Sequence, residues 1–253
     1  MAKKDFGAIE NDYAFFMTHA TEAENDAAAY CRELEDFASE RASIRMLDFG
    51  CGNGEFTQRL LSELNWSPEL LQLTIVEPVR HQREQAAQRL TPYSRHAIEA
   101  TETLTGEQVF DLVLSNHTLY YVDDLAATLR RIVDSLAPRG KLLLAIAGWE
   151  NPLLKLWQTG FARLGRPVPY YAAEDVQDVL TDLSVRHRTS KVHYQLAFPD
   201  NLENRLRILR FLFGEYLQEI TPEPLLSEFD EHVREDHIHV ETHSLHFLVE
   251  PVT

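Results

Sequence analysis

Along the first 150 residues, short apolar runs alternate with longer segments in which apolar residues recur at helical spacing. The short runs predict strands over residues 44–49, 71–76, 95–100, 109–115 and 141–147. The longer segments predict helices over residues 12–40, 56–64, 78–90 and 123–136. Because strands and helices alternate in this way, the sequence predicts an α/β fold with a doubly wound parallel sheet.

The pattern changes after the fifth predicted strand. Helical spacing there predicts helices over residues 149–164, 173–183, 202–220 and 222–233. Residues 185–196 and 243–250 are strand-like, and the second of these segments alternates apolar and polar positions. We therefore expect one domain, residues 1–253, with a sheet of about seven strands. Segments 149–164 and 202–233 exceed the minimal sheet, and we expect them to form a helical lid or substrate wall beyond the carboxyl ends of the strands.

The most informative segment is the glycine-rich loop after the first predicted strand. Gly50, Gly52 and Gly54 stand at alternate positions between an apolar run and a helical pattern. Because glycine has no Cβ, such a loop lets backbone N–H groups and a helix N-terminus approach a ligand closely. The next strand ends at Glu77, whose carboxylate can accept hydrogen bonds from both hydroxyls of a ribose. Together these features predict a βαβ unit that binds a nucleoside-type cofactor.

Three interpretations of this loop are open: an NAD site, a site for another nucleoside cofactor, or a turn without a ligand. The dinucleotide fingerprint is G-x-G-x-x-G, whereas Gly54 comes one residue early. Asp48 precedes the loop, and the order acid, any residue, G-x-G-x-G resembles motif I of the class I S-adenosylmethionine-dependent methyltransferases. The resemblance implies a Rossmann-like fold with an antiparallel last strand and S-adenosyl-L-methionine as cofactor. It also implies that Gly50 and Gly52 lie against the amino-acid part of the cofactor and that Glu77 binds the ribose.

Other segments of the chain resemble the histamine N-methyltransferase family. They comprise residues 19–22, 119–124, 148–149, 156–157 and 244–250. The resemblance implies that Glu22 binds the substrate and that Gln82, like Glu77, contacts the cofactor. Two further substrate contacts of the family, a glutamine and an asparagine, are replaced here by His117 and His243. Because both replacements exchange an amide for an imidazole, the resemblance implies a small nitrogen nucleophile without implying histamine itself.

The chemistry of methyl transfer explains why these residue types matter. A sulfonium methyl group is already activated, so an enzyme mainly has to hold a nucleophile in line with it. An amine must be neutral to attack, and a nearby carboxylate or imidazole can orient it and accept its proton. We expect Glu22, His117 and His243 to converge on one pocket, with Glu22 as anchor and an imidazole as base. The alternative is that each side chain is solvated or only satisfies a neighbour.

The ends of the third and fourth predicted strands complete the expected cofactor site. In the resembled fold, the residues at the end of the third strand meet the adenine ring, which implies a contact between residues 99–101 and the base. We assign this contact to Thr101. Asn116 lies at the end of the next strand and is expected near the cofactor, since ligands lie beyond the carboxyl ends of such strands.

Charge, cysteine content and hydropathy limit the classes of partner and the location that the sequence predicts. The chain has 24 Lys and Arg against 40 Asp and Glu, a formal charge of −16, so phosphate backbones are repelled and no nucleic-acid substrate is expected. Cys31 and Cys51 are its two cysteines, and the second lies inside the glycine loop, which argues against a structural disulfide and favours the cytoplasm. We expect no membrane span, because the longest apolar run, residues 142–147, is far too short. The histidines lack metal-ligand spacing, so no metal site is expected.

The sequence therefore predicts a cytoplasmic methyltransferase that acts on a small molecule, at a nitrogen of an amine or heteroaromatic ring. Carboxyl or hydroxyl O-methylation is the alternative on the same fold. A carboxylate substrate would need a cluster of Arg or other polar donors, and Arg163 and Arg166 are the available candidates. A third interpretation is a regulatory protein that binds the cofactor without turnover.

Overall fold

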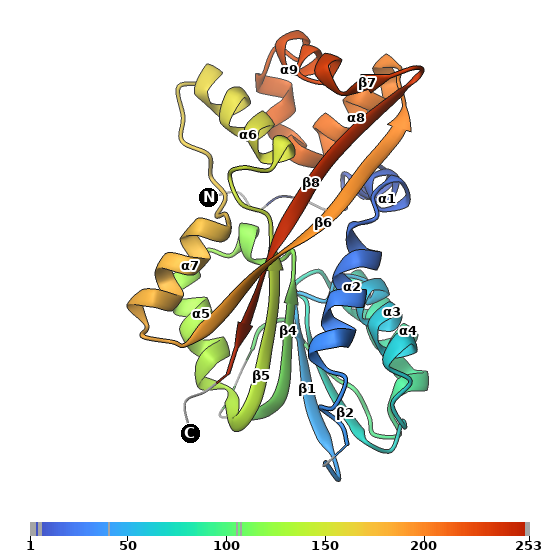
Figure 1. The fold of residues 1–253 in the computed structure, drawn as a ribbon, viewed down its shortest axis with the longest axis vertical. Coiled ribbons are helices and arrows are strands. Elements are labelled where there is room, and N and C mark those ends of the chain that lie inside the picture. Colours follow the sequence, from blue (N-terminus) through green and yellow to red (C-terminus); the bar gives the residue numbers. More distant parts are fainter. Residues whose placement is uncertain (1–3, 5–6, 40, 105, 107, 251–253) are drawn as a thin grey trace.

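The computed structural model describes residue 4 and residues 7–250, apart from residues 40, 105 and 107. Within them, a sheet of eight strands runs in the order β3-β2-β1-β4-β5-β8-β6, with β7 paired to β8 (Figure 1). The strands are β1 (Ile44–Phe49), β2 (Leu71–Val76), β3 (Glu99–Thr101), β4 (Phe110–Asn116), β5 (Leu136–Ile146), β6 (His187–Pro199), β7 (Val233–Arg234) and β8 (His237–Val249). Strands β1 to β5 pair in parallel, and β8 pairs antiparallel with β5 and β6. The predicted doubly wound sheet with an antiparallel last strand is thus confirmed.

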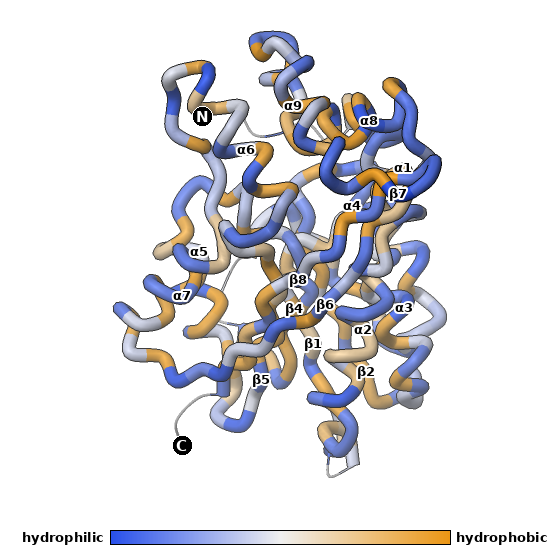
Figure 2. Tube along the Cα trace, turned by 45° about the horizontal axis from the view of Figure 1, so that its top comes forward, coloured by the Kyte–Doolittle hydropathy of each residue, from blue (hydrophilic) through white to orange (hydrophobic). Residues whose placement is uncertain are grey.

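Helices cover both faces of this sheet. The α-helices of the described residues are α1 (Glu10–His19), α2 (Glu22–Glu33), α3 (Glu55–Leu64), α4 (Arg80–Leu90), α5 (Leu125–Asp134), α6 (Pro152–Arg163), α7 (Ala173–Asp182), α8 (Leu202–Phe213) and α9 (Glu223–Ser227). Helices α2, α3 and α4 pack on one face, and α5 and α7 pack on the other. Adjacent residues of β1 enter opposite cores, Met46 the first and Leu47 the second. Because both faces are buried, the central strands are largely hydrophobic (Figure 2).

A second layer of helices lies beyond the carboxyl ends of the parallel strands. Strand β5 pairs only with residues 245–249 of β8, whereas β6 pairs with all of residues 237–249. The two long strands therefore continue past the parallel sheet as a ribbon, around which α1, α6, α8 and α9 pack (Figure 1). Since α6 and α8 belong to the predicted additions, this layer is where a lid or substrate wall would act.

The structure differs from the prediction at two of the expected helices. The helix expected over residues 12–40 is two helices, because Ala20 is extended and forms a bridge with Leu196 of β6. Residues 222–233 contain only α9, a 3-10 turn and the first residue of β7. The last long strand, β8, is inserted between β5 and β6. No helix in the described part of the chain is long and apolar enough to cross a bilayer.

Candidate active site

A cavity of about 840 Å³ opens at the carboxyl ends of β1, β2 and β4. One side is formed by the glycine-rich loop after β1, by Glu77 after β2 and by His117 after β4. The other side is formed by residues of α1, α2, α6 and α8. Ligands of open α/β sheets bind in the crevice outside the carboxyl ends of the strands. This cavity is therefore the candidate active site.

Gly50 and Gly52 have different surroundings, although both have a positive φ, +77° and +53°. A Cβ atom on Gly50 would lie 2.0 Å from Cγ2 of Thr118, so this position is closed by packing. A Cβ on Gly52 would meet nothing closer than Oε1 of Gln82, at 3.9 Å. Because Gly52 lines the cavity, the space left by its missing side chain lets a ligand approach the backbone.

Two buried carboxylates, at the ends of β1 and β2, bind the loop and the helix that follows it. Glu77 accepts hydrogen bonds from the N–H of Gly52 at 3.1 Å and from the N–H of Val79 at 2.8 Å. Burial raises the pKa of Glu77, and these two N–H groups oppose the rise. Asp48 accepts a hydrogen bond from the Thr57 hydroxyl, and burial raises the pKa of Asp48 to about 7. Both carboxylates line the cavity, and Glu77 connects the end of β2 to the loop whereas Asp48 connects the end of β1 to α3.

The other residues predicted to hold the cofactor divide into two groups. Gln82 and Asn116 line the cavity, whereas Gly54 and Thr101 do not. Gly54 is the N-cap residue of α3, with φ of +81°. The carbonyl of Thr101 accepts a hydrogen bond from the N–H of Glu77 at 3.0 Å. After β3 the chain lines the cavity with residues 102–104. An adenine contact from Thr101 stays a prediction, and the adjoining segment is better placed for it.

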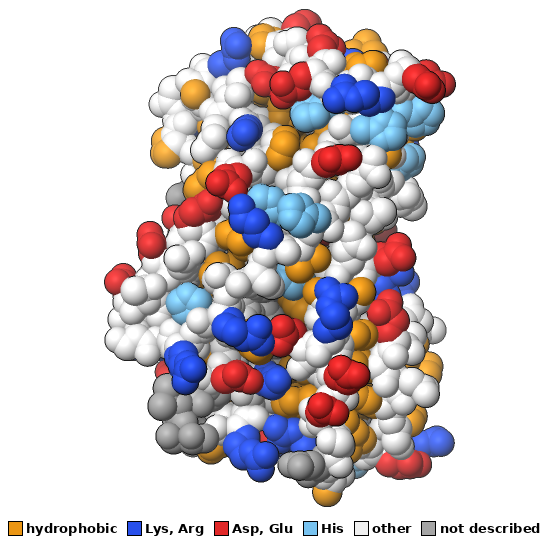
Figure 3. Space-filling view, in the orientation of Figure 1, with side chains coloured by type: hydrophobic (Ala, Val, Ile, Leu, Met, Phe, Trp, Pro, Cys, Tyr) orange, Lys and Arg blue, Asp and Glu red, His pale blue; other side chains and the backbone are white. Residues whose placement is uncertain are grey.

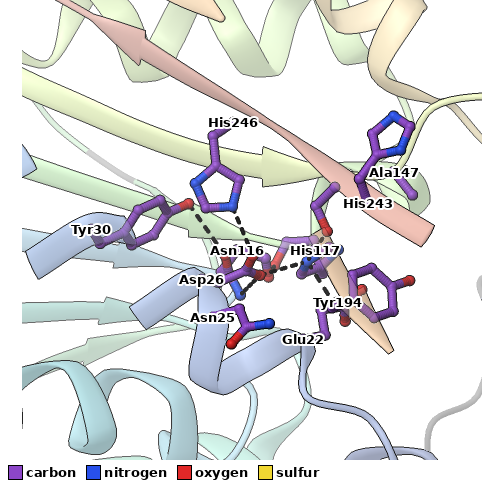
Figure 4. Close-up of polar contacts among 12 residues, drawn as sticks. Glu22, Asn25, Asp26, Tyr30, Asn116, His117, Ala147, Tyr194, His243 and His246 are labelled. Carbon is purple, nitrogen blue, oxygen red and sulfur yellow. Dashed lines mark hydrogen bonds and ion pairs between the residues drawn. The ribbon is translucent and has the colours of Figure 1, made fainter. Parts of the chain in front are cut away.

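The structure brings Glu22 and His117 together. Oε2 of Glu22 lies 3.6 Å from Nε2 of His117 (Figure 4). Glu22 is the first residue of α2, so its position is set by the point at which the chain leaves α1 and begins this second helix. His117 follows β4 with φ of +52°, a left-handed conformation that few non-glycine residues adopt. In this conformation its ring faces α2 and closes one wall of the cavity.

Asp26, which the sequence interpretation missed, joins these two residues. It lies one turn after Glu22 on the same face of α2 and is fully buried. One carboxylate oxygen is 2.9 Å from Nε2 of His117, and the other is 2.7 Å from Nε2 of His246 on β8 (Figure 4). The spacing of four residues from Glu22 was the available signal, because residues i and i+4 of a helix share a face.

Both ring nitrogens of His117 are occupied. Nε2 has Asp26 as its nearest partner, with Oγ of Ser244 at 3.4 Å. Nδ1 lies 3.1 Å from the hydroxyl of Tyr120, which also accepts a hydrogen bond from the N–H of Ala147 at 2.6 Å. The ring therefore turns neither nitrogen toward the open cavity.

The cluster perturbs its own pKa values. Burial disfavours the imidazolium, but the Glu22 and Asp26 carboxylates outweigh it and raise the pKa of His117 to about 9. Burial also disfavours the Asp26 carboxylate, but hydrogen bonds from His117 and His246 lower its pKa to about 2. Burial raises the pKa of Glu22, while His117 and hydrogen bonds from Tyr194 and Ser244 limit the rise. At neutral pH His117 is thus a cation between two carboxyl groups.

His243 does not join this cluster, contrary to the predicted convergence. It is absent from the cavity lining, and its ring points away from His117 (Figure 4). Because successive side chains of a strand alternate between faces, Ser244 takes the inward position and His243 faces outward. There its Nε2 lies 3.7 Å from Glu150, and histidines gather over β6 and β8 on this surface (Figure 3). Burial and the nearby Lys191 lower the pKa of His243.

The rest of the cavity wall is acidic and aromatic. Its carboxylates are Glu10, Glu22, Asp48, Glu55, Glu77, Glu102, Asp123 and Asp124, and its aromatic residues include Tyr13, Phe16, Tyr121, Trp157 and Phe211. Among the described lining residues, Lys4 and Arg131 are the Lys and Arg side chains. Burial lowers the pKa of Lys4 to about 7, and Arg131 donates a hydrogen bond to the carbonyl of Leu104. Arg163 and Arg166 do not line the cavity, and Arg166 pairs with Glu219 at 3.0 Å.

The chain belongs to the methyltransferase domain family, whose sequence profile matches residues 22–195. This match and the fold confirm the predicted class, the class I S-adenosylmethionine-dependent methyltransferases. The matched segment contains the glycine loop, Glu77, Asp26 and His117 but ends before β8.

Particular relatives differ in the acceptor that their names state. Malonyl-[acyl-carrier protein] O-methyltransferase of Bacillus cytotoxicus is 31% identical over 122 residues, which cover 46% of this chain and 40% of that protein. Histamine N-methyltransferase A of Xenopus laevis is 24% identical over 181 residues, covering 63% of this chain and 60% of that protein. The chain thus matches about half the length of these relatives. The crystal structure of the YcgJ protein from Bacillus subtilis shares the fold, with a TM-score of 0.56, 12% identity and coverage of 91% and 100% of the two chains.

Proposed function

We propose that this protein transfers the methyl group of S-adenosylmethionine to a nitrogen atom of a small molecule. The observation that carries the proposal is that Glu22 and His117 stand on the wall of the same cavity as Gly52 and Glu77. A cofactor held by the glycine loop and a substrate held by Glu22 would therefore share one enclosed space. Enclosure favours in-line transfer, because it fixes the nucleophile relative to the methyl group.

The residues of the loop fit the cofactor. The open space beside Gly52 would admit a ligand against the backbone, and Glu77, which lines the same cavity, would accept hydrogen bonds from ribose hydroxyls. When bound there, S-adenosylmethionine would supply an activated methyl group. The remaining work of the protein is to bind the acceptor, orient its lone pair and accept its proton.

The charge of the cavity supports a nitrogen acceptor. Among the residues that the structure describes, eight carboxyl groups line it against one lysine and one arginine. This surplus attracts an amine and repels an ionised carboxylic acid. The neighbouring aromatic side chains can pack against the apolar or cationic parts of such a substrate. A carboxylate acceptor would instead require cationic donors near the Glu22 side of the cavity.

Glu22 is the better candidate for the proton acceptor, although an imidazole was expected in that role. A base must direct a lone pair toward the proton that it accepts. His117 has both nitrogens occupied and carries a proton at neutral pH, whereas the Glu22 carboxylate, which accepts hydrogen bonds from Tyr194 and Ser244, has further lone pairs that can take a proton. Burial raises the pKa of Glu22, which strengthens it as a base. The charge of His117, whose Nε2 lies 3.6 Å from Oε2 of Glu22, then favours the ionised form of Glu22.

A methyl-transfer screen over amines, imidazoles, phenols and carboxylic acids, read by S-adenosylhomocysteine release, tests the proposal. We expect turnover with amines or heteroaromatic nitrogens and a loss of about 10²-fold in kcat for Glu22→Gln. Glu24→Gln changes an exposed carboxylate of the same helix and should leave turnover unchanged. Turnover restricted to phenols or carboxylic acids would show O-methylation. S-adenosylhomocysteine binding without turnover on any class would favour a regulatory protein.

A further inference from the structure

We propose that Asp26 is a positioning residue, clamped by His246, that holds Nε2 of His117 while Tyr120 holds Nδ1, so that the ring donates hydrogen bonds and does not take the substrate proton. This inference deepens the proposed function and rests on it for the meaning of the site. The arrangement itself can be tested without a substrate. Its elements come from three parts of the fold, namely α2, the end of β4 and β8.

The clamp is bidentate and fully enclosed. Each oxygen of Asp26 has one imidazole nitrogen as its short partner, at 2.9 Å for His117 and 2.7 Å for His246. The Asn116 amide approaches one of these oxygens at 3.5 Å. With both oxygens engaged, the carboxylate cannot rotate without breaking a hydrogen bond in a buried site. The direction of the His117 ring is thereby tied to β8 as well as to α2.

The second nitrogen of His117 is also held in place. Nδ1 faces the Tyr120 hydroxyl at 3.1 Å, and that oxygen already accepts the N–H of Ala147. If His117 carries protons on both nitrogens, the Tyr120 oxygen accepts two hydrogen bonds and its own proton is not given to His117.

The charges around the ring favour the doubly protonated form. The ionisable groups that face His117 are Glu22 and Asp26 from α2 and Tyr120 from the turn after β4, with His246 of β8 behind Asp26. Tyr194 of β6 lies beside Glu22 and hydrogen-bonds it. The upward shift of the His117 pKa to about 9 agrees with this geometry, because the two carboxylates outweigh burial.

Stability alone does not account for a buried carboxylate between two imidazoles. Moving an ionised carboxylate out of water costs several kcal/mol even after relaxation, and well-packed apolar side chains often replace buried ion pairs without loss. Tyr30, one turn after Asp26 on α2, lies in the hydrophobic core, so an apolar residue at position 26 would extend that core. The Asp26 carboxylate lies next to Glu22 and His117, the two residues proposed to form the substrate side of the cavity.

Histidine NMR titration of the complete protein tests the inference. The His117 signal is assigned by its absence in His117→Asn, and its titration midpoint is measured in the wild type, in Asp26→Asn and in Glu24→Gln as the matched helix control. We expect the midpoint to fall by at least about one pH unit in Asp26→Asn and to stay unchanged in Glu24→Gln. An unchanged midpoint in a folded Asp26→Asn protein would overturn the proposal.

A second pair of variants at His246 covers the case in which Asp26→Asn does not fold. His246→Leu removes the donor to Asp26, whereas His246→Gln can restore an N–H near the same place. We expect the His117 midpoint to fall in the Leu variant and to recover in the Gln variant, with kcat lowered about 10-fold or more in the Leu variant only. Equal midpoints in the two variants would contradict the clamp. If no methyl acceptor is found, the proposed function fails while the NMR result still decides the role of Asp26.

Discussion

Alanine at Gly50 and at Gly52 should damage the protein in different ways. At both positions alanine would adopt a left-handed backbone, which costs about 1–2 kcal/mol. At Gly50 the new Cβ would also overlap Thr118, whose Cγ2, Oγ1 and Cβ would lie at 2.0, 2.4 and 2.7 Å. Thr118 would have to move and lose its hydrogen bonds to the carbonyls of Gly50 and Asn116, at 3.0 and 3.2 Å.

These terms predict the size of the difference. The lost hydroxyl contact of Thr118 costs about 1 kcal/mol, and the displacement in a packed site costs about 1–3 kcal/mol. Gly50→Ala should therefore lower the free energy of unfolding by about 3–6 kcal/mol. Gly52→Ala should lower it by only about 1–2 kcal/mol, because its Cβ would meet only a distant Gln82 oxygen. In the proposed cofactor site, however, that Cβ would fill the space through which the cofactor reaches the backbone.

Urea unfolding followed by circular dichroism, together with calorimetry of S-adenosylhomocysteine binding, separates the two effects. Gly52→Ala should remain folded and lose measurable binding, whereas Gly50→Ala should lose most stability. Adding Thr118→Ala to Gly50→Ala should restore part of that stability, since it removes two of the three overlapping atoms, and it should not help Gly52→Ala. Equal stability losses in the two single variants, or wild-type affinity in Gly52→Ala, would refute the reasoning.

Three further predictions concern the cofactor, the buried cluster and the helical layer. Glu77→Ala should weaken S-adenosylhomocysteine binding by about 1.5–3 kcal/mol in calorimetry, and unchanged affinity would remove Glu77 from the ribose site. The pKa of His117 rises on folding from 6.5 to about 9, so its stabilising contribution is complete below pH 6.5 and is lost as the pH rises through 9. Denaturant unfolding should show the free energy of unfolding of the wild type falling by up to about 3 kcal/mol over this pH range relative to His117→Asn. Asparagine is chosen because it tolerates the left-handed backbone at this position. Parallel curves of stability against pH for the two proteins would contradict the shift. Hydrogen exchange in α6 and α8 should slow when cofactor and substrate bind, because both helices wall the cavity, and equal protection in both states would leave them as plain structure.

Local sequence signals were sufficient for the parallel half of the fold. The run from β1 through the glycine loop to β2 and Glu77 is encoded by neighbouring residues, because apolar periodicity and glycine positions act over a few residues. Glu22 and His117 were selected through the family resemblance and the position after β4, and the structure places them 3.6 Å apart. Asp26 was not predicted as a site residue, because an acidic residue on a helix usually lies on the solvated face of that helix.

Only the tertiary structure decided which side chains reach the cavity. His243 and Ser244 are adjacent, and the pairing of β8 with β5 and β6 turns Ser244 inward and His243 outward. The break between α1 and α2 likewise depends on the bridge from Ala20 to Leu196, residues far apart in the chain. If the pairing register of a strand shifts by one residue, every side chain moves to the opposite face of the sheet. The register of β8 is set by its pairing with β5 and β6, which are distant from it in the sequence. The amino-acid sequence by itself thus determined the class of fold and the cofactor loop, while long-range strand pairing determined the composition of the buried cluster.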